Sequence, residues 1–322
     1  MKLIAVYLVI SFVGGNLLAA AESFICVPKG TCSTNEVIST PSPINPRIAS
    51  PNQRCLNDQE PCYTLPCGTR FVGNVSTKNG LATPGAYPWL VYITNETGHT
   101  GAGVLLDSIH VLTAAHKVSV YVDKPANITL SFGVYHPDAK GNVQNISAAA
   151  IDIHPAFDST TLFNDVAIVT LASPVSLGST TGVNAACLPS AKQSFTGRWC
   201  VVAGWGQTGF GASDASTMPQ KQVTIPIVSY KTCRASMAQS NTLGHLVDKY
   251  LDPAGEICAG GRAQADACTQ DGGSPLICLD QVTSRYVVAG LVIWGKKCGI
   301  PGVYGVYANI PYYRQWINEY GV

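Results

Sequence analysis

Beyond Arg70 the chain consists of short runs of β-branched and aromatic residues, separated by the turn-forming residues Gly, Pro, Asn and Asp. The runs include TGAGVLLDSIHVLTAA, NITLSFGVY, NDVAIVTL, WCVVAGWG, KQVTIPIV and RYVVAGLVIWG. Many strands at such short spacing are typical of an antiparallel barrel or sandwich. The last segment, IPYYRQWINEYGV, has a helical pattern instead, with four apolar residues on one face: Ile310, Tyr313, Trp316 and Ile317. The sequence therefore predicts an all-β domain that ends in a helix.

The first residues, MKLIAVYLVISFVGGNLLAAAES, have the pattern of a secretory signal peptide. We expect cleavage after Ala21, so residues 1–21 are the predicted signal and the mature protein is secreted. Twelve cysteines in an exported chain are typical of disulfides. No Cys-x-x-Cys pair occurs, and we expect no metal and no other cofactor.

The charge is nearly balanced, with 20 basic and 19 acidic residues and a formal net charge of +1. This balance gives no basic surface for nucleic acid or for an anionic membrane. No later apolar run approaches the length that spans a bilayer, so we expect a soluble protein. Four sequons predict N-glycosylation of a secreted protein, at Asn74, Asn95, Asn127 and Asn145.

The N-terminal part of the mature chain is dense in cysteine and proline, with STPSPINPRIASPNQR between Cys32 and Cys55. A segment this short cannot bury a large apolar core, so it needs disulfides to hold a fold. We therefore expect a small disulfide-stabilised module before the all-β domain.

Three motifs follow one another in the all-β part: LTAAH at 112–116, NDVAI at 164–168 and DACTQDGGSPL at 266–276. They resemble the histidine, aspartate and nucleophile motifs of the trypsin-like serine proteases, the third of which reads D-A-C-x-G-D-S-G-G-P-L in that family. Further family motifs come in the same order: Pro88-Trp89, Cys187-Leu188-Pro189, Ala203-Gly204-Trp205-Gly206, Trp294-Gly295 and Pro301-Gly302-Val303-Tyr304. The resemblance covers about residues 71–322 and implies the family's double antiparallel β-barrel with a C-terminal helix.

The family's chemistry needs a serine that attacks the scissile carbonyl while histidine accepts its proton and aspartate orients the histidine. Aligned through the third motif, the nucleophile position falls on Gly272, and Gln270 replaces the glycine that contributes to the oxyanion hole. His116 and Asp165 are then relics of a triad, kept as a buried pair or used to bind a partner. The alternative that Ser274 acts as a displaced nucleophile requires a hydroxyl several ångströms from the family's position. The resemblance thus implies a pseudoenzyme.

Asp266 stands where trypsin-like enzymes carry the carboxylate at the base of the specificity pocket. It either still captures a basic side chain or is a relic of that pocket. Lys296 and Lys297 replace a glycine at the pocket mouth, which favours the relic.

The resemblance also implies disulfides, which we list as expected pairs: Cys67–Cys187, Cys200–Cys278, Cys233–Cys258 and Cys268–Cys298. The family's bridge beside the catalytic histidine is lost at both ends, with Gly101 and Lys117 in place of the two cysteines.

The N-terminal module, with Cys26-Val27-Pro28-Lys29-Gly30-Thr31-Cys32, resembles the clip domain of arthropod serine protease homologues but has two cysteines fewer. If the absent ones are the first and the fifth, the expected pairs are Cys26–Cys55 and Cys32–Cys62. The alternative is an unrelated disulfide-stabilised tail. We expect a clip-like domain at 22–62, a linker at 63–78 and the inactive protease-like domain at 79–322. Proteolytic activation is expected at Arg47, with Arg70 as the other candidate.

The resemblance implies a secreted, non-catalytic cofactor or regulator of an extracellular protease cascade, with a role in prophenoloxidase activation and melanisation. Its expected partners are a clip-domain protease, prophenoloxidase or a microbial surface. Two alternatives stay open from the sequence: an active trypsin-like endopeptidase, and a structural or developmental extracellular binding protein.

Overall fold

The computed structural model describes residues 65–73, 75–76, 80–138, 141–206, 219–239, 243–263, 271–296 and 299–322, together with the backbone of four short N-terminal strands. These strands are β1 (Phe24–Pro28), β2 (Cys32–Ser33), β3 (Glu36–Val37) and β4 (Gln59–Tyr63). They form two small antiparallel sheets, β1 with β4 and β2 with β3. The expected pairs Cys26–Cys55 and Cys32–Cys62 lie outside the described side chains.

Six antiparallel strands close the first barrel, in the order β10-β7-β6-β5-β8-β9. Their bounds are β5 (Leu90–Asn95), β6 (Gly98–Leu105), β7 (His110–Thr113), β8 (Thr129–Phe132), β9 (Gln144–Ile153) and β10 (Ala167–Leu171). The interior is filled by aliphatic and aromatic side chains that include Ile93, Leu130 and Phe132. The 3-10 turns η2 (Ser119–Tyr121) and η3 (Pro125–Asn127) connect β7 to β8.

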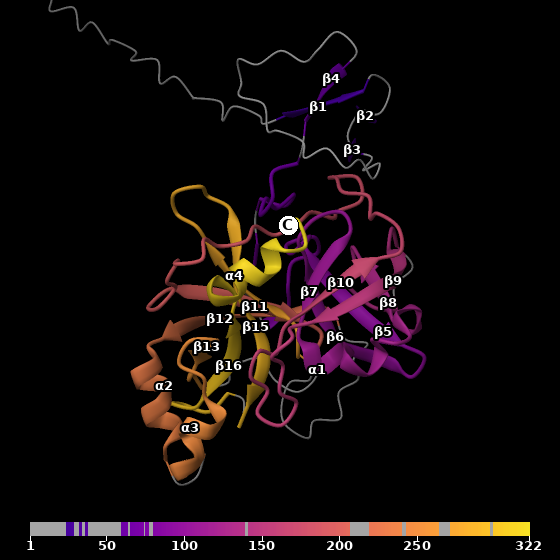
Figure 1. The fold of residues 1–322 in the computed structure, drawn as a ribbon. Helices are drawn as coiled ribbons and strands as arrows, with labels where there is room; N and C mark the ends of the chain where they lie inside the picture. The colour runs from indigo at the N-terminus through magenta and orange to yellow at the C-terminus, as the bar shows by residue number, and fades with distance from the viewer. Residues whose placement is uncertain are drawn as a thin grey trace, which may run out of the picture.

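A second barrel follows in the order β11-β12-β13-β16-β15-β14. Its strands are β11 (Trp199–Gly204), β12 (Lys221–Val228), β13 (Glu256–Gly260), β14 (Pro275–Leu279), β15 (Tyr286–Gly295) and β16 (Tyr304–Asn309). Figure 1 shows this barrel in orange and yellow beside the magenta first barrel. The predicted trypsin-like double barrel is confirmed.

The long apolar run of β15 is explained by burial on both of its faces. Successive side chains of a strand point to opposite faces. Accordingly, Val287 and Ala289 belong to the interior of the second barrel, whereas Val288 belongs to the apolar cluster between the two barrels. That cluster also includes Trp89 and Leu112 of the first barrel. The two barrels therefore share one apolar interface, and the loops at its edge are held in fixed positions.

Among the residues that the structure describes, the domain also has four short helices: α1 (Ala115–Val118), α2 (Tyr230–Met237), α3 (Val247–Tyr250) and α4 (Ile310–Asn318), with the 3-10 turn η4 (Gly244–Leu246) before α3. The predicted apolar face of α4 packs into the cluster between the barrels, with Tyr313 2% exposed and Ile317 fully buried. Within the described part of the chain, no helix is both long and apolar enough to cross a membrane.

Three disulfides join described residues: Cys67–Cys187, Cys200–Cys278 and Cys233–Cys258. They have the same partners that the resemblance implies. The first ties the segment before the barrels to the domain. The fourth expected pair, Cys268–Cys298, falls on residues outside the described part of the chain.

Candidate functional site

His116 and Asp165 form a hydrogen-bonded pair at the edge of the first barrel. The backbone N–H of His116 donates to Asp165 Oδ1 at 2.8 Å, and His116 Nδ1 lies 2.5 Å from Oδ2. The Asp165 side chain is fully buried, whereas that of His116 is 24% exposed. This arrangement leaves the other ring nitrogen, Nε2, free to face the second barrel.

The turn before β10 determines the direction of the Asp165 side chain. Asn164 has a φ of 56°, a left-handed conformation that asparagine adopts more readily than most residues. Its side-chain amide donates to the carbonyl of Ala156 at 2.9 Å, and its own carbonyl accepts from the N–H of Val166 at 2.8 Å. The asparagine before Asp165 in the motif therefore has a structural role in this turn.

Gly272, from the segment that leads into β14, lies against His116. A Cβ atom built on Gly272 would lie 3.0 Å from His116 Nε2. The carbonyl of Gly272 accepts from the N–H of Ala102 in β6 at 3.1 Å, which joins this segment to the first barrel. A serine side chain at this position would start beside the imidazole, as the nucleophile of a triad must.

The side chain of Lys117 occupies the space that a side chain at position 272 would need. The same Cβ atom would clash with Lys117 Cε and lie 3.1 Å from Nζ. A Cβ atom on Gly101 in β6 would lie 3.0 Å from Lys117 Cγ, 3.1 Å from Cδ and 2.8 Å from the Gly272 carbonyl oxygen. Gly101 and Gly272 thus both leave room for the lysine stem.

The sequence analysis considers Lys117 only as a residue in place of a cysteine of the family. The structure shows in addition that its aliphatic stem fills the centre of the site. The available signal was a lysine directly after His116, where the family has a cysteine. A lysine at this position does not by itself predict that its stem reaches Gly272. The contact depends on the absence of side chains at Gly101 and Gly272, which are distant in the sequence.

Burial lowers the pKa of Lys117, while the carboxylates of Asp165 and Asp271 act in the opposite direction. Burial, together with the nearby charge of Lys117, lowers the pKa of His99 to about 4. The ring of His99 stacks on Tyr92, with the centroids 4.5 Å apart. Near neutral pH this corner of the site therefore contains a neutral His99 beside a half-buried lysine.

Asp271 and Ser274 point away from His116. Asp271 Oδ1 accepts from the N–H of Gly206 at 2.9 Å. Ser274 is fully buried, and a Cβ atom on Gly204 would lie 2.6 Å from its hydroxyl oxygen. A hydroxyl enclosed in this way cannot reach a substrate carbonyl, so the geometry opposes Ser274 as a displaced nucleophile.

Arg70 is held against the domain. Its guanidinium lies over the ring of Tyr286 at 3.9 Å and over that of Tyr87 at 4.7 Å. The neighbouring backbone is also fixed, because Asn184 Nδ2 donates to the Thr69 carbonyl at 3.0 Å and the Gly68 carbonyl accepts from the Tyr286 N–H at 2.9 Å. A protease needs an accessible segment, so this environment disfavours cleavage after Arg70.

The described sequons differ in accessibility. Asn127 and Asn145 are exposed. Asn95 donates its side-chain nitrogen to the Tyr121 hydroxyl at 2.6 Å. Since a glycan attaches to that nitrogen, the structure favours Asn127 and Asn145 as acceptors.

Several predicted site residues lie outside the described part of the chain: Asp266, Gln270, Lys297, Asn74 and Arg47. Lys296 is described and exposed.

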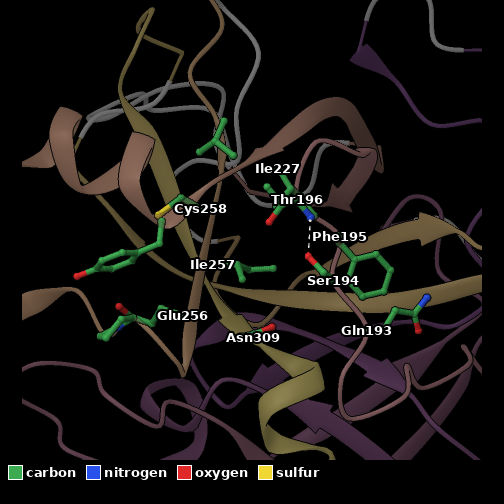
Figure 2. A pocket seen from close by; sticks show the side chains of 12 residues that line it. Gln193, Ser194, Phe195, Thr196, Ile227, Glu256, Ile257, Cys258 and Asn309 are labelled. Carbon is green, nitrogen blue, oxygen red and sulfur yellow. Dashed lines mark hydrogen bonds between the residues drawn. The ribbon is translucent and has the colours of Figure 1, made fainter.

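A pocket of about 220 Å³ lies away from His116, between the loop that follows Ser190 and the end of β12 (Figure 2). Its lining includes Glu256 of β13, which the sequence analysis did not single out. Burial raises the pKa of Glu256 to about 8, although its carboxylate accepts from the Asp252 N–H at 2.8 Å and from Trp294 Nε1 at 3.2 Å. The only feature of the sequence that could have indicated this buried acid is its position at the start of an apolar strand.

Comparison with known proteins adds three findings to this geometry. The family model described as Trypsin matches residues 78–317. Inactive CLIP domain-containing serine protease A3 of Aedes aegypti is 33% identical, over 92% of this chain and 67% of the relative. Inactive CLIP domain-containing serine protease A8 of Anopheles gambiae is 32% identical, over 77% of this chain and 68% of the relative.

A third relative, Phenoloxidase-activating factor 2 of Galleria mellonella, is 30% identical, over 78% of this chain and 85% of the relative. Relatives of this chain thus include insect proteins that are named inactive and one that is named for activating phenoloxidase.

Proposed function

Because this chain belongs to the trypsin family, we propose that it is a secreted member of that family that binds partners instead of cutting peptide bonds. In this proposal the clip-like domain spans 22–62, the linker 63–78 and the protease-like domain 79–322. Gly272 takes the nucleophile's position, and His116 and Asp165 are retained for structure.

The observation that carries the proposal is the contact between Lys117 and Gly272. A base needs a hydroxyl to deprotonate, and a Cβ atom on Gly272, 3.0 Å from His116 Nε2, would clash with the lysine stem. Loss of the nucleophile of such a triad costs about a millionfold in turnover, or about 8 kcal/mol in the activation barrier. Within the described part of the chain, Ser274 does not take over this role, because its hydroxyl is enclosed.

The proposed role is that of a cofactor or regulator in an extracellular protease cascade, with prophenoloxidase activation and melanisation as the process. The names of the insect relatives support it. Suitable partners are a clip-domain protease, prophenoloxidase or a microbial surface. The rigid double barrel would present its loops to that partner, since loops on a fixed scaffold commonly carry binding specificity.

Cleavage at Arg47 is the proposed activating event, because Arg70 is held between Tyr87 and Tyr286. Arg47 lies in the proline-rich loop of the clip-like segment. A protein with Arg47→Gln should stay intact when the activating protease is added, and a protein with Arg70→Gln should still be cut.

The function is tested in a reconstituted reaction of purified prophenoloxidase and its activating protease. The cleaved protein should change phenoloxidase activity in a dose-dependent way. The matched variant His116→Gln, whose side-chain amide can still donate to the buried Asp165, should have the same effect as the native protein, because the role needs no catalysis. Absence of any effect, or loss of the effect in a His116→Gln protein that is folded by circular dichroism, would contradict the proposal.

The second candidate is an active trypsin-like endopeptidase, and the intact bond between His116 and Asp165 is the observation that favours it. It requires a nucleophile that Gly272 does not supply. Turnover of a basic-residue ester distinguishes the two candidates.

A further inference from the structure

The half-buried amine of Lys117 is a chemical group that the proposed function does not use. Its stem passes Gly101 and reaches Gly272, so that Nζ lies 3.1 Å from the point where a Cβ atom at position 272 would be. His116 Nε2 lies 3.0 Å from the same point. A nitrogen nucleophile and an imidazole therefore flank the place where a serine side chain would begin.

We propose that Lys117 is a reactive amine that forms imines with small aldehydes in the former active site. The aldehyde has to be small because Lys117 is half-buried and its amine lies beside Gly272 and His116, whose side chain is only 24% exposed. The proposal does not depend on the partner of the protein or on its role in a cascade.

Burial and the lack of an ion pair favour the neutral, nucleophilic form of the amine. The ionisable groups that face it are His99 of β6, His116 of its own helix, Asp165 before β10 and Asp271 before β14. The two carboxylates favour the protonated amine, but among the described residues neither forms an ion pair with Lys117. Burial opposes them and lowers the pKa of Lys117.

The chemistry balances without a further reactant. The neutral amine attacks the carbonyl carbon of the aldehyde, a C–N bond forms, and one proton moves from nitrogen to oxygen to give a carbinolamine. The hydroxyl then leaves as water with the second N–H proton, and a C=N bond remains. Water reverses the reaction, so the adduct is transient unless it is reduced.

The test is competitive labelling of the native protein with propanal and sodium cyanoborohydride at pH 7. Cyanoborohydride delivers hydride to each imine and converts it to a stable secondary amine. Peptide mass mapping then gives the rate of labelling at every lysine. Lys124, Lys231 and Lys249 are exposed and serve as internal standards. We expect Lys117 to react several-fold faster than these three at pH 7, with the difference shrinking at pH 10 where all amines approach neutrality.

Two variants connect the rate to the geometry. Lys117→Arg should remove the fast-reacting site and leave the labelling of the exposed lysines unchanged. Gly272→Ser should reduce the advantage of Lys117, because the new Cβ atom pushes Cε from its position. Labelling of Lys117 no faster than that of Lys124 in the native protein, or an advantage unchanged in Gly272→Ser, would overturn the proposal.

Discussion

Three residues that are distant in the sequence, Gly101, Lys117 and Gly272, depend on one another in the site. The lysine stem fits only because neither glycine carries a side chain. Replacing any one of the three by the residue that the family has at that position therefore changes the packing of the other two. The loss of the bridge beside His116 and the proposed loss of the nucleophile are in this sense one structural change.

This dependence gives a prediction for repair of the active site. Gly272→Ser with Gln270→Gly restores the family's residues in the third motif but leaves Lys117 against the new side chain. A hydroxyl displaced by even 1 Å loses about a hundredfold in rate. Adding Lys117→Ala should therefore raise kcat/KM for a basic-residue ester well above that of the double variant.

The control for this comparison is Lys117→Ala alone, which should stay inactive because Gly272 still lacks a hydroxyl. Equal kcat/KM in the double and triple variants would show that Lys117 does not obstruct the site.

At the scale of single elements, β13 combines an apolar strand with a buried acid at its first residue. Glu256 is 4% exposed and accepts hydrogen bonds from Asp252 N–H and Trp294 Nε1, both neutral donors. Neutral donors compensate the loss of water around a carboxylate only in part. Glu256 is therefore protonated in the folded protein at a pH where it is ionised in the unfolded chain.

The consequence is a fall in stability as pH rises. Burial raises the pKa of Glu256 from its ordinary value of 4.5 to about 8 in the folded protein, so between these values only the folded state keeps the proton. From pH 6 to pH 8 this group should reduce the free energy of unfolding by about 2 kcal/mol. Glu256→Gln does not titrate and should remove this part of the pH dependence in urea unfolding.

The matched control is Glu96→Gln, which replaces an exposed acid in the turn between β5 and β6 and should leave the pH dependence as in the native protein. If native and Glu256→Gln proteins lost the same stability between pH 6 and pH 8, Glu256 would not be protonated in the fold.

Much of the element level was predictable from local patterns. The face of α4 followed from helical spacing, and the strands followed from β-branched runs between turns. The burial of β15 on both faces was not predictable. A continuous apolar run does not say which residues face the interior of the second barrel and which face the first barrel. The pocket beside Glu256 was not predictable either, because it is formed by segments that meet only in the tertiary structure.

The candidate site was predictable only in part. The motif order identified His116 and Asp165, and the structure brings them within hydrogen-bond distance. The position of the Lys117 side chain depends on the space beside two glycines, and sequence spacing contains no information about that space. The enclosure of Ser274 likewise follows from the close approach of Gly204.

At the scale of the whole molecule, the apolar cluster between the barrels is independent of the proposed loss of catalysis. The cluster includes the apolar side chains of Trp89, Leu112, Trp205 and Leu291. Gly272 is not part of this cluster, so a glycine in place of the nucleophile leaves the two barrels packed and their loops in position for the proposed binding role. The pairing of His116 with Asp165 is expected to stabilise the fold, because an unpaired Asp165 would be a costly buried charge.

The most direct test of the central claim is turnover of a benzoyl-arginine ester by the Arg47-cleaved native protein, compared with its His116→Ala variant under the same conditions. Measurement over many equivalents separates turnover from a single acylation of Lys117. The account predicts equal rates for the two proteins, both at the level of the buffer. Sustained hydrolysis by the native protein above that of His116→Ala would contradict it, because it would show that His116 still serves a working nucleophile.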